Sequence, residues 1–190
     1  MSLKTTDRLT FGTLFSLFNL RGLYTLSFSF IFGMSLWVTF IGGVITYKTL
    51  PRQQFGSLQQ RLFPVYFKLN ALISSGLLLV WVRNHDTVIT QIAHPTNPDV
   101  SQAYALAVVA ISQALNAVWI GPATSKLLAA RFRLEKAEGK DANDADVSVD
   151  MKKLNAKFAR LHGYSSLANL TAFLALVFHG LWIGNYGIST

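Results

Sequence analysis

The sequence predicts an all-α integral membrane protein built as a bundle of four transmembrane helices. Of its 190 residues, 51% are hydrophobic and only 14% are charged, which is too apolar for the surface of an ordinary soluble domain. The charges are also clustered, because long uncharged tracts separate Arg21 from Lys48, Asp99 from Lys126, and Arg160 from the C-terminus. Each of these tracts exceeds the roughly 20 residues that cross a hydrocarbon core. We therefore expect a single membrane domain that takes in the whole chain, residues 1–190.

Apolar segments and prolines together divide the chain into spans and loops. We expect four spans, at about residues 23–47, 62–82, 100–120 and 165–183. The first exceeds the apolar core of a secretory signal peptide, about 7 to 15 residues, so we expect it to remain as an anchor. Pro64 is expected in the first turn of the second helix, where its missing N–H has no partner, and Pro122 is expected to close the third. Between the last two spans lies a long polar stretch, residues 126–160, whose acidic part we expect to be mobile.

Two further segments show helical periodicity outside the spans. In the N-terminal segment, the spacing of the apolar residues would place them on one face of a helix: Phe11, Leu14, Phe15 and Phe18. They indicate a short helix lying in the membrane interface, with a frayed tail as the alternative. Before span four, apolar side chains recur at spacings of three and four, and basic side chains occupy the other faces: Lys152, Lys153, Lys157 and Arg160. This pattern indicates an amphipathic helix on anionic headgroups, or a fourth span that begins early with a solvated face.

The distribution of basic residues predicts the orientation of the bundle. The first and third loops together carry twelve Lys and Arg, and the opposite side carries four. By the positive-inside rule, both loops are expected in the cytosol and both termini outside it, although Arg21 directly abuts the first span. The net charge of +8 does not indicate nucleic acid binding, because the basic residues lie at the ends of apolar segments and not on one compact face.

Small residues along the third span predict close helix packing. They follow heptad-like spacing at Ala103, Ala107, Ala110, Ala114, Ala117 and Gly121. In lipid, small residues let two helices approach closely. The first span offers a matching ladder in Ser35, Thr39 and Gly43, so we expect these two helices to pack together.

Polar residues inside the spans are costly unless they are paired, so we expect them to face the bundle. The candidate intramembrane cluster is Lys68, Asn70, Ser74, Gln113, Asn116, His162 and Asn169. Such a cluster serves either as interhelical glue, the commoner use, or as a path for a solute. Lys68 is the exception, because its long stem also allows its ammonium group to snorkel to the headgroups.

Catalytic and cofactor chemistry finds little support in the sequence. There is no cysteine, which excludes disulfides and thiolate metal sites. His162 and His179 lie about 25 Å apart on one helix, so they cannot hold one haem or metal ion together. His85, His94 and His179 are all expected near the non-cytosolic ends, where we expect solvated side chains. We therefore expect no enzyme activity, no cofactor and no metal site.

Several short motifs carry a family resemblance. They read WVTF at 37–40, LPR at 50–52, FG at 55–56, LFPVYF at 62–67, NAVWIGP at 116–122 and HGYSSLANL at 162–170. In this order they resemble the TMEM205-like family, four-span membrane proteins that are also described as a domain of unknown function. Animal members carry an Arg and a Glu where this chain has Val118 and Gly121, so a mechanism that uses that charged pair does not transfer.

The resemblance implies a multi-pass protein of the endoplasmic reticulum, secretory pathway or plasma membrane, linked to trafficking and drug tolerance. Together with the small-residue stripe, it favours a small scaffold or trafficking-related factor that acts through the lipid bilayer and other membrane proteins. The alternative is a transporter of a small solute, although coupled pumps usually need titratable groups at membrane depth.

Overall fold

The computed structural model describes residues 9–188, and these residues form helices and connecting turns without a strand. In chain order, with η for π-helical segments, the elements are α1 (Phe11–Ser16), α2 (Leu20–Leu36), η1 (Trp37–Gly42), α3 (Gly43–Thr49), α4 (Arg52–Asn84), α5 (Thr87–Thr90), α6 (Pro98–Leu115), η2 (Asn116–Ile120), α7 (Gly121–Glu138) and α8 (Val149–Tyr186). Among the described residues they form four continuous helical rods that are long and apolar enough to cross a membrane. The predicted fold class is confirmed.

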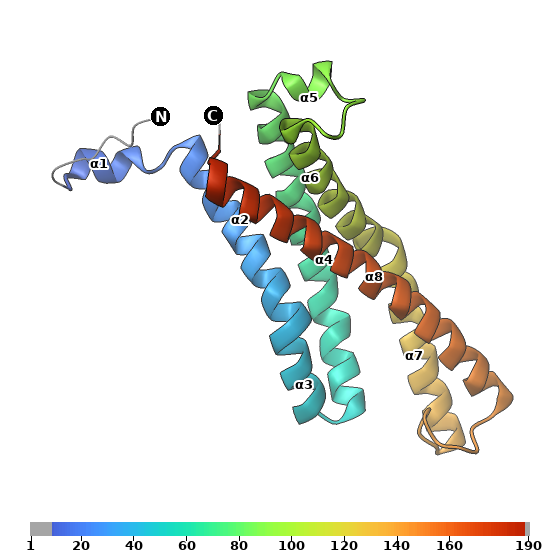
Figure 1. Ribbon diagram of the computed structural model, residues 1–190. Helices are drawn as coiled ribbons and strands as arrows, with labels where there is room; N and C mark the ends of the chain where they lie inside the picture. Colours follow the sequence, from blue (N-terminus) through green and yellow to red (C-terminus); the bar gives the residue numbers. More distant parts are fainter. Residues whose placement is uncertain (1–8, 189–190) are drawn as a thin grey trace.

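The α6 helix occupies the centre of the bundle. It packs mainly on α4 and α8, and α2 packs on the same two helices from another side. Figure 1 shows α1, α5 and the C-terminal end of α8 at one end of the bundle. The turn between α3 and α4 and the loop between α7 and α8 lie at the other end. We call these the terminal end and the loop end.

The N-terminal segment forms the short helix that its periodicity predicted. Thr10 caps α1, since its side chain accepts a hydrogen bond from the N–H of Thr13 and its own N–H donates to the Thr13 hydroxyl. Phe11 and Phe15 remain largely exposed, because α1 lies to the side of the bundle and not inside it (Figure 1). An exposed aromatic face of this kind suits the membrane interface.

The helices extend well beyond the expected spans. Pro64 lies in the interior of α4, twelve residues after its start at Arg52, so its predicted place in the first turn was wrong. Pro64 is exposed on the outer side of α4, and a membrane helix can re-satisfy a freed carbonyl locally. Pro122 does not end the third helix either, because α7 continues the rod to Glu138.

Two of the rods contain a π-helical segment, and the one in the third rod precedes Pro122. In η2, the wider turn leads the Gly121 N–H to the carbonyl of Asn116, five residues earlier. A Cβ on Gly121 would lie 2.5 Å from that oxygen, so glycine is required here. The same relation holds in η1, where a Cβ on Gly43 would lie 2.8 Å from the Val38 oxygen. Pro122 follows directly at the start of α7, where the widened turn accommodates a residue without an N–H.

The stretch between the last two spans is mostly helical, so the expected polar loop over residues 126–160 is confined to its acidic part. Residues up to Glu138 belong to α7, and Gly139 ends the helix in the left-handed conformation at φ 64°. Residues 139–148 form the only connecting loop here, and Ala142, Val147 and Met151 are buried as a small apolar cluster against Leu134. The loop therefore packs onto the helices that it connects.

The basic segment before span four is helical as predicted, but it is not a separate interfacial helix. Residues 149–186 form one unbroken α8, which begins at Ser148 with a hydrogen bond from the Met151 N–H to the serine hydroxyl. Nothing interrupts the backbone hydrogen bonds between the basic segment and the apolar segment, so the early-starting fourth helix is the alternative that the structure shows.

The small-residue stripe borders the most buried face of α6. Ala103 and Ala110 are buried, and the other members of the stripe are half-buried. The residue directly before each member of the stripe is buried. Together these residues form the most buried face of α6 and η2, which consists of Gln102, Leu106, Val109, Gln113, Asn116 and Ile120. The expected packing of the stripe on the first span was wrong: α6 contacts α4 and α8, and Ser35 and Thr39 bond to Asn70 and Asn169 instead.

We expect Ala110→Leu to lower the free energy of unfolding by about 1–3 kcal/mol, because the larger side chain must fit where α6 meets its neighbours. Melting midpoints in one detergent measure the effect. Val108→Leu is the matched control, since Val108 is 37% exposed and faces away from the bundle. Equal midpoints for the two variants would contradict close packing along α6.

Candidate functional site

The interior of the bundle holds a polar cluster that connects all four rods near their middle. Asn169 on α8 is its centre, because its Oδ1 accepts hydrogen bonds from the Tyr66 hydroxyl at 2.8 Å and from Gln113 Nε2 at 3.1 Å. Its Nδ2 donates to Thr39 Oγ1 at 2.9 Å. One amide thus links α8 to α4, α6 and η1. In lipid no water is present to hydrogen-bond these groups, so they must bond to one another, and the cluster fixes how the helices pack.

A second layer surrounds this centre. The Ser35 hydroxyl donates to Asn70 Oδ1 at 3.2 Å, and Asn116 Nδ2 donates to the backbone oxygen of Ser165 at 3.2 Å. The Ser74 hydroxyl is satisfied within its own helix by the Asn70 carbonyl. The structure therefore brings Asn70, Gln113, Asn116 and Asn169 together with Ser35, Thr39 and Tyr66; we call these seven residues the amide cluster.

Three residues predicted for this cluster lie outside it: the buried Ser74, which bonds within its own helix, and the exposed Lys68 and His162. Lys68 is exposed on the outer surface of α4, two residues away from the buried Tyr66 and Asn70, and so points in another direction round the helix. This placement agrees with a snorkelling side chain. His162 is also exposed, and its ring stacks on Phe158 with centroids 5.8 Å apart. The prediction that Ser74, Lys68 and His162 join the cluster was wrong.

A second set of polar side chains lies inside the half of the bundle nearer the terminal end. The Tyr24 hydroxyl lies 2.7 Å from His179 Nε2, and His179 Nδ1 lies 2.9 Å from Gln102 Oε1. Because an amide oxygen only accepts, Nδ1 carries the proton and the Tyr24 hydroxyl donates to Nε2. We call Tyr24, Gln102 and His179 the histidine cluster.

Aromatic rings enclose His179 completely. Its ring is fully buried, with Trp81 edge-on at 5.2 Å and Phe28 edge-on at 5.6 Å between centroids. The expectation that His179 is solvated near the end of the bundle was therefore wrong. His85 is also buried, since it stacks on Trp81 at 4.1 Å and its Nδ1–H donates to the Trp81 carbonyl. Within the described residues, no group of three or more His, Asp or Glu side chains could hold a metal ion.

Tyr24, Tyr66 and Gln102 are the members that sequence reasoning missed. Gln102 had a signal, because it precedes Gln113 by three helical turns and so shares a face of α6 with it. The two tyrosines had none, since tyrosine is equally common at membrane interfaces. Only the packing of the helices shows that their hydroxyl groups point inward.

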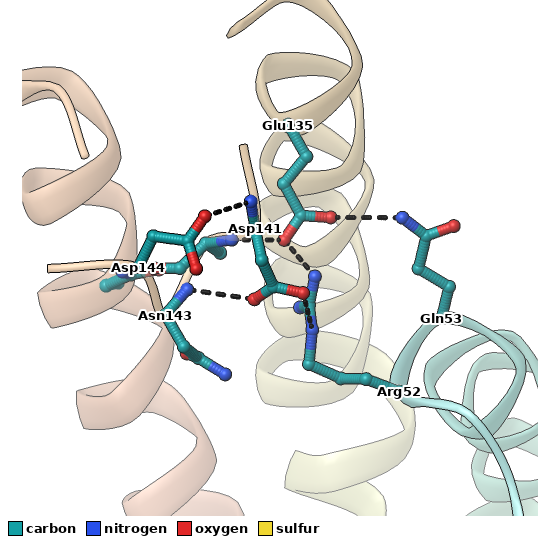
Figure 2. A network of polar contacts seen from close by, with 8 residues as sticks. Arg52, Gln53, Glu135, Asp141, Asn143 and Asp144 are labelled. Atoms are coloured by element: carbon teal, nitrogen blue, oxygen red, sulfur yellow. Dashed lines mark hydrogen bonds and ion pairs between the residues drawn. The ribbon is translucent and has the colours of Figure 1, made fainter. Parts of the chain in front are cut away.

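A third polar network ties the loop end together (Figure 2). Arg52, at the start of α4, forms an ion pair with Glu135 on α7 and donates from Nε to Asp141 Oδ2 at 3.0 Å. The Glu135 side chain is only 3% exposed, and it also accepts the Ala142 N–H at 2.8 Å. The Asn143 N–H, and then the Arg52 guanidinium, hold the pKa of Asp141 below its usual range. This network attaches the loop to both α4 and α7.

Comparisons with known proteins match this architecture. Residues 26–133 match the family model described as a domain of unknown function, DUF4149, which is more than half of the chain. The chain belongs to this TMEM205-like family. It is 27% identical to Transmembrane protein 205 of Danio rerio over 174 residues, or 85% of this chain and 89% of that protein. It is 24% identical to Xanthocillin biosynthesis cluster protein D of Aspergillus fumigatus over 173 residues, or 88% and 90%. No solved structure matches it significantly.

The family match includes the amide cluster apart from Asn169, and it includes both π-helical segments. Val118 is 76% exposed and faces away from the cluster. Position 121 borders the Asn116 carbonyl so closely that only glycine fits. Val118 thus lies within η2 and Gly121 directly after it, and neither belongs to the amide cluster.

We expect Asn169→Leu to lower the free energy of unfolding by about 1–3 kcal/mol, because it leaves the polar groups of Tyr66, Gln113 and Thr39 buried without their partner. Melting in detergent, followed by circular dichroism, measures the change. Asn185→Leu is the control on the same helix, since Asn185 is exposed and bonds only to the Leu181 carbonyl. Equal losses in both variants would show that the cluster does not stabilise the bundle.

We expect Arg52→Gln to destabilise the protein by about 1–3 kcal/mol at neutral pH, since the buried Glu135 carboxylate loses its cation. Lys153→Gln is the control, because Lys153 pairs with Asp150 at 67% and 78% exposure. The pKa of Asp141 is lower in the folded state, so its contribution exists above the usual aspartate range and disappears as pH falls through the folded value. The difference between wild type and Arg52→Gln should shrink in that acidic range; a constant difference would contradict the role of Asp141.

Proposed function

We propose that the chain is a non-catalytic membrane adaptor, a small scaffold or trafficking-related factor of an endomembrane or the plasma membrane. In this proposal the bundle anchors the protein, and the hairpin of α7 and α8 presents its contact surface in the cytosol. The hairpin, residues 126–160, is called the stalk below. The single observation that supports the proposal best is the length and charge of this stalk.

The stalk extends beyond what a membrane can cover. The 38 residues of α8 span about 57 Å at helical rise, whereas a hydrocarbon core is about 30 Å thick. About half of α8 must therefore lie outside the hydrocarbon, and α7 runs beside it. Because α8 is unbroken, this part is a rigid extension of the anchor, and Arg52, Glu135 and Asp141 brace its tip against α4.

Charges on the stalk separate by position. Exposed basic side chains lie along both helices, at Lys126, Arg133, Lys136, Lys152, Lys153, Lys157 and Arg160. Exposed acidic side chains gather at the tip, at Asp141, Asp144, Asp146 and Asp150. Basic residues next to the bilayer favour anionic headgroups, and an acidic tip is repelled from them. The stalk should thus stand on the cytosolic surface with its tip free for partner proteins.

Polar groups inside the membrane suit an anchor. Most members of the amide cluster and the histidine cluster bond to one another, as interhelical glue does. Lys68 is exposed on the outside of the bundle. Among the described residues, no charged side chain therefore lies inside the bundle at the depth of the amide cluster. Coupled transport usually depends on such charges.

The alternative is a transporter of a small solute, and one observation favours it. Three buried polar atoms on one face of the central helix have no hydrogen-bond partner: Gln102 Nε2, Gln113 Oε1 and Asn116 Oδ1. Unpaired buried groups of this kind can receive a water molecule or a polar solute. Leu106 and Val109, both fully buried, separate Gln102 from the other two and would act as a hydrophobic gate.

Crosslinking in native membranes followed by mass spectrometry tests the adaptor. We expect the wild type to capture stable partner proteins, and Asp144→Lys with Asp146→Lys to capture at least tenfold less of them, because the partners contact the tip. Asp86→Lys, an exposed change at the terminal end, is the control. Capture that is unaffected by the tip variant would contradict the proposal. Solute flux in proteoliposomes, abolished by Asn116→Leu, would support the transporter instead.

A further inference from the structure

A groove between α2 and the C-terminal part of α8 is not used by the proposed adaptor function. It has a volume of about 370 Å³ and lies at the terminal end, where Arg21 and Thr25 on α2 face Gly180, Gly184 and neighbouring residues on α8. Phe28 and Ile183 supply apolar parts of its wall. Its position separates it from the stalk, which projects at the loop end (Figure 1).

Glycines on α8 create the groove. A Cβ on Gly180 would lie 2.8 Å from the ring of Phe28, so this ring packs directly on the bare helix backbone and closes the inner end. One turn further, a Cβ on Gly184 would have nothing within 4 Å. The space beside Gly184 is therefore open, whereas the space beside Gly180 is filled by the protein itself.

The groove combines an apolar wall with one cation. Among the residues that the structure describes, Arg21 is the only charged one that lines the groove, and the Thr25 hydroxyl is already satisfied by the Arg21 carbonyl at 2.9 Å. Within residues 9–188, no carboxylate forms an ion pair with Arg21. Arg21 also marks the start of the uncharged tract of the first span, which places its guanidinium at headgroup level.

We propose that this groove binds one anionic phospholipid. Arg21 holds the phosphate through its planar donor groups, and one acyl chain lies along the open space at Gly184 against Ile183 and Phe28. Both walls belong to membrane-spanning helices, so the groove is exposed to the acyl chains of the bilayer. The charge of the groove then selects an anionic headgroup over a zwitterionic one.

A second copy of the chain is the competing occupant, because Gly180 and Gly184 form a small-xxx-small pair. Two features favour lipid. Phe28 already covers Gly180, so only half of the pair remains available for a close helix crossing. A two-fold symmetric dimer through this groove would also bring the two Arg21 side chains towards each other, which costs free energy without an anion between them.

Native mass spectrometry of the purified full chain tests the proposal, with phosphatidylglycerol and phosphatidylcholine offered in mixed nanodiscs. We expect the wild type to retain one phosphatidylglycerol in preference to phosphatidylcholine. Arg21→Gln should reduce this preference about fivefold, the effect of removing one basic residue at a membrane surface. Gly184→Leu should abolish retention of both lipids, because its Cβ has open space around it and the rest of the side chain then fills the groove.

Two variants serve as controls. Arg83→Gln removes an exposed basic residue near the same end of the bundle, and Gly163→Leu enlarges another glycine of α8 that has open space around it. Both should retain phosphatidylglycerol as the wild type does. Wild-type retention by both Arg21→Gln and Gly184→Leu would overturn the proposal. A lipid-free dimer that Gly184→Leu dissociates would overturn it in favour of the second copy. If Gly184→Leu melts far below Gly163→Leu, the Arg21→Gln result alone decides.

Discussion

The hydrogen bonds of Asn169 are the interaction on which the bundle depends most. A membrane removes water as a competitor for polar groups, so the amides and hydroxyls inside the spans must find each other. Asn169 receives bonds from α4 and α6 and donates to η1, and in this way sets the relative position of all four rods. Dispersion between apolar faces supports the arrangement, but it specifies no register by itself.

The buried face of the central helix connects the amide cluster with the histidine cluster. One face of α6 presents Gln102, Leu106, Val109, Gln113 and Asn116 in heptad order, and each is buried. Polar groups at the two ends of this face meet the histidine cluster and the amide cluster, and the apolar pair between them fills the core. The π turn in η2 then redirects the rod so that α7 continues beside α8 into the stalk.

The two ends of the molecule differ in their chemistry. At the loop end, Arg52, Glu135 and Asp141 join three segments and hold the stalk in place. At the terminal end, glycines on α8 leave a groove open to lipid beside Arg21. In the function that we propose, the bundle anchors the protein and the braced, charged stalk presents a contact surface to partners. The DUF4149 family match places this architecture in a family without a described activity.

The sequence by itself determined the membrane class, the four rods and the inward direction of Asn70, Gln113, Asn116 and Asn169. These follow from local rules, because apolar length and the cost of burying an amide in lipid need no knowledge of neighbours. Proline positions misled, since Pro64 lies exposed inside α4 and Pro122 follows the π turn of η2, and neither ends its rod.

Only the tertiary structure decided which side chains meet. Lys68 and His162 carry polar groups on helices that also contribute to the amide cluster, yet both are exposed. Lys68 points another way round α4, and His162 lies two helical turns before Asn169 on α8. Tyr24, Tyr66 and His179 have aromatic rings that carry a polar group and suit either an interface or a core, so their burial depends on helices that are distant in sequence. The docking of the loop through Arg52 likewise joins residues 83 and 89 positions apart. Contacts of this kind depend on how rods cross, which periodicity within one rod does not encode.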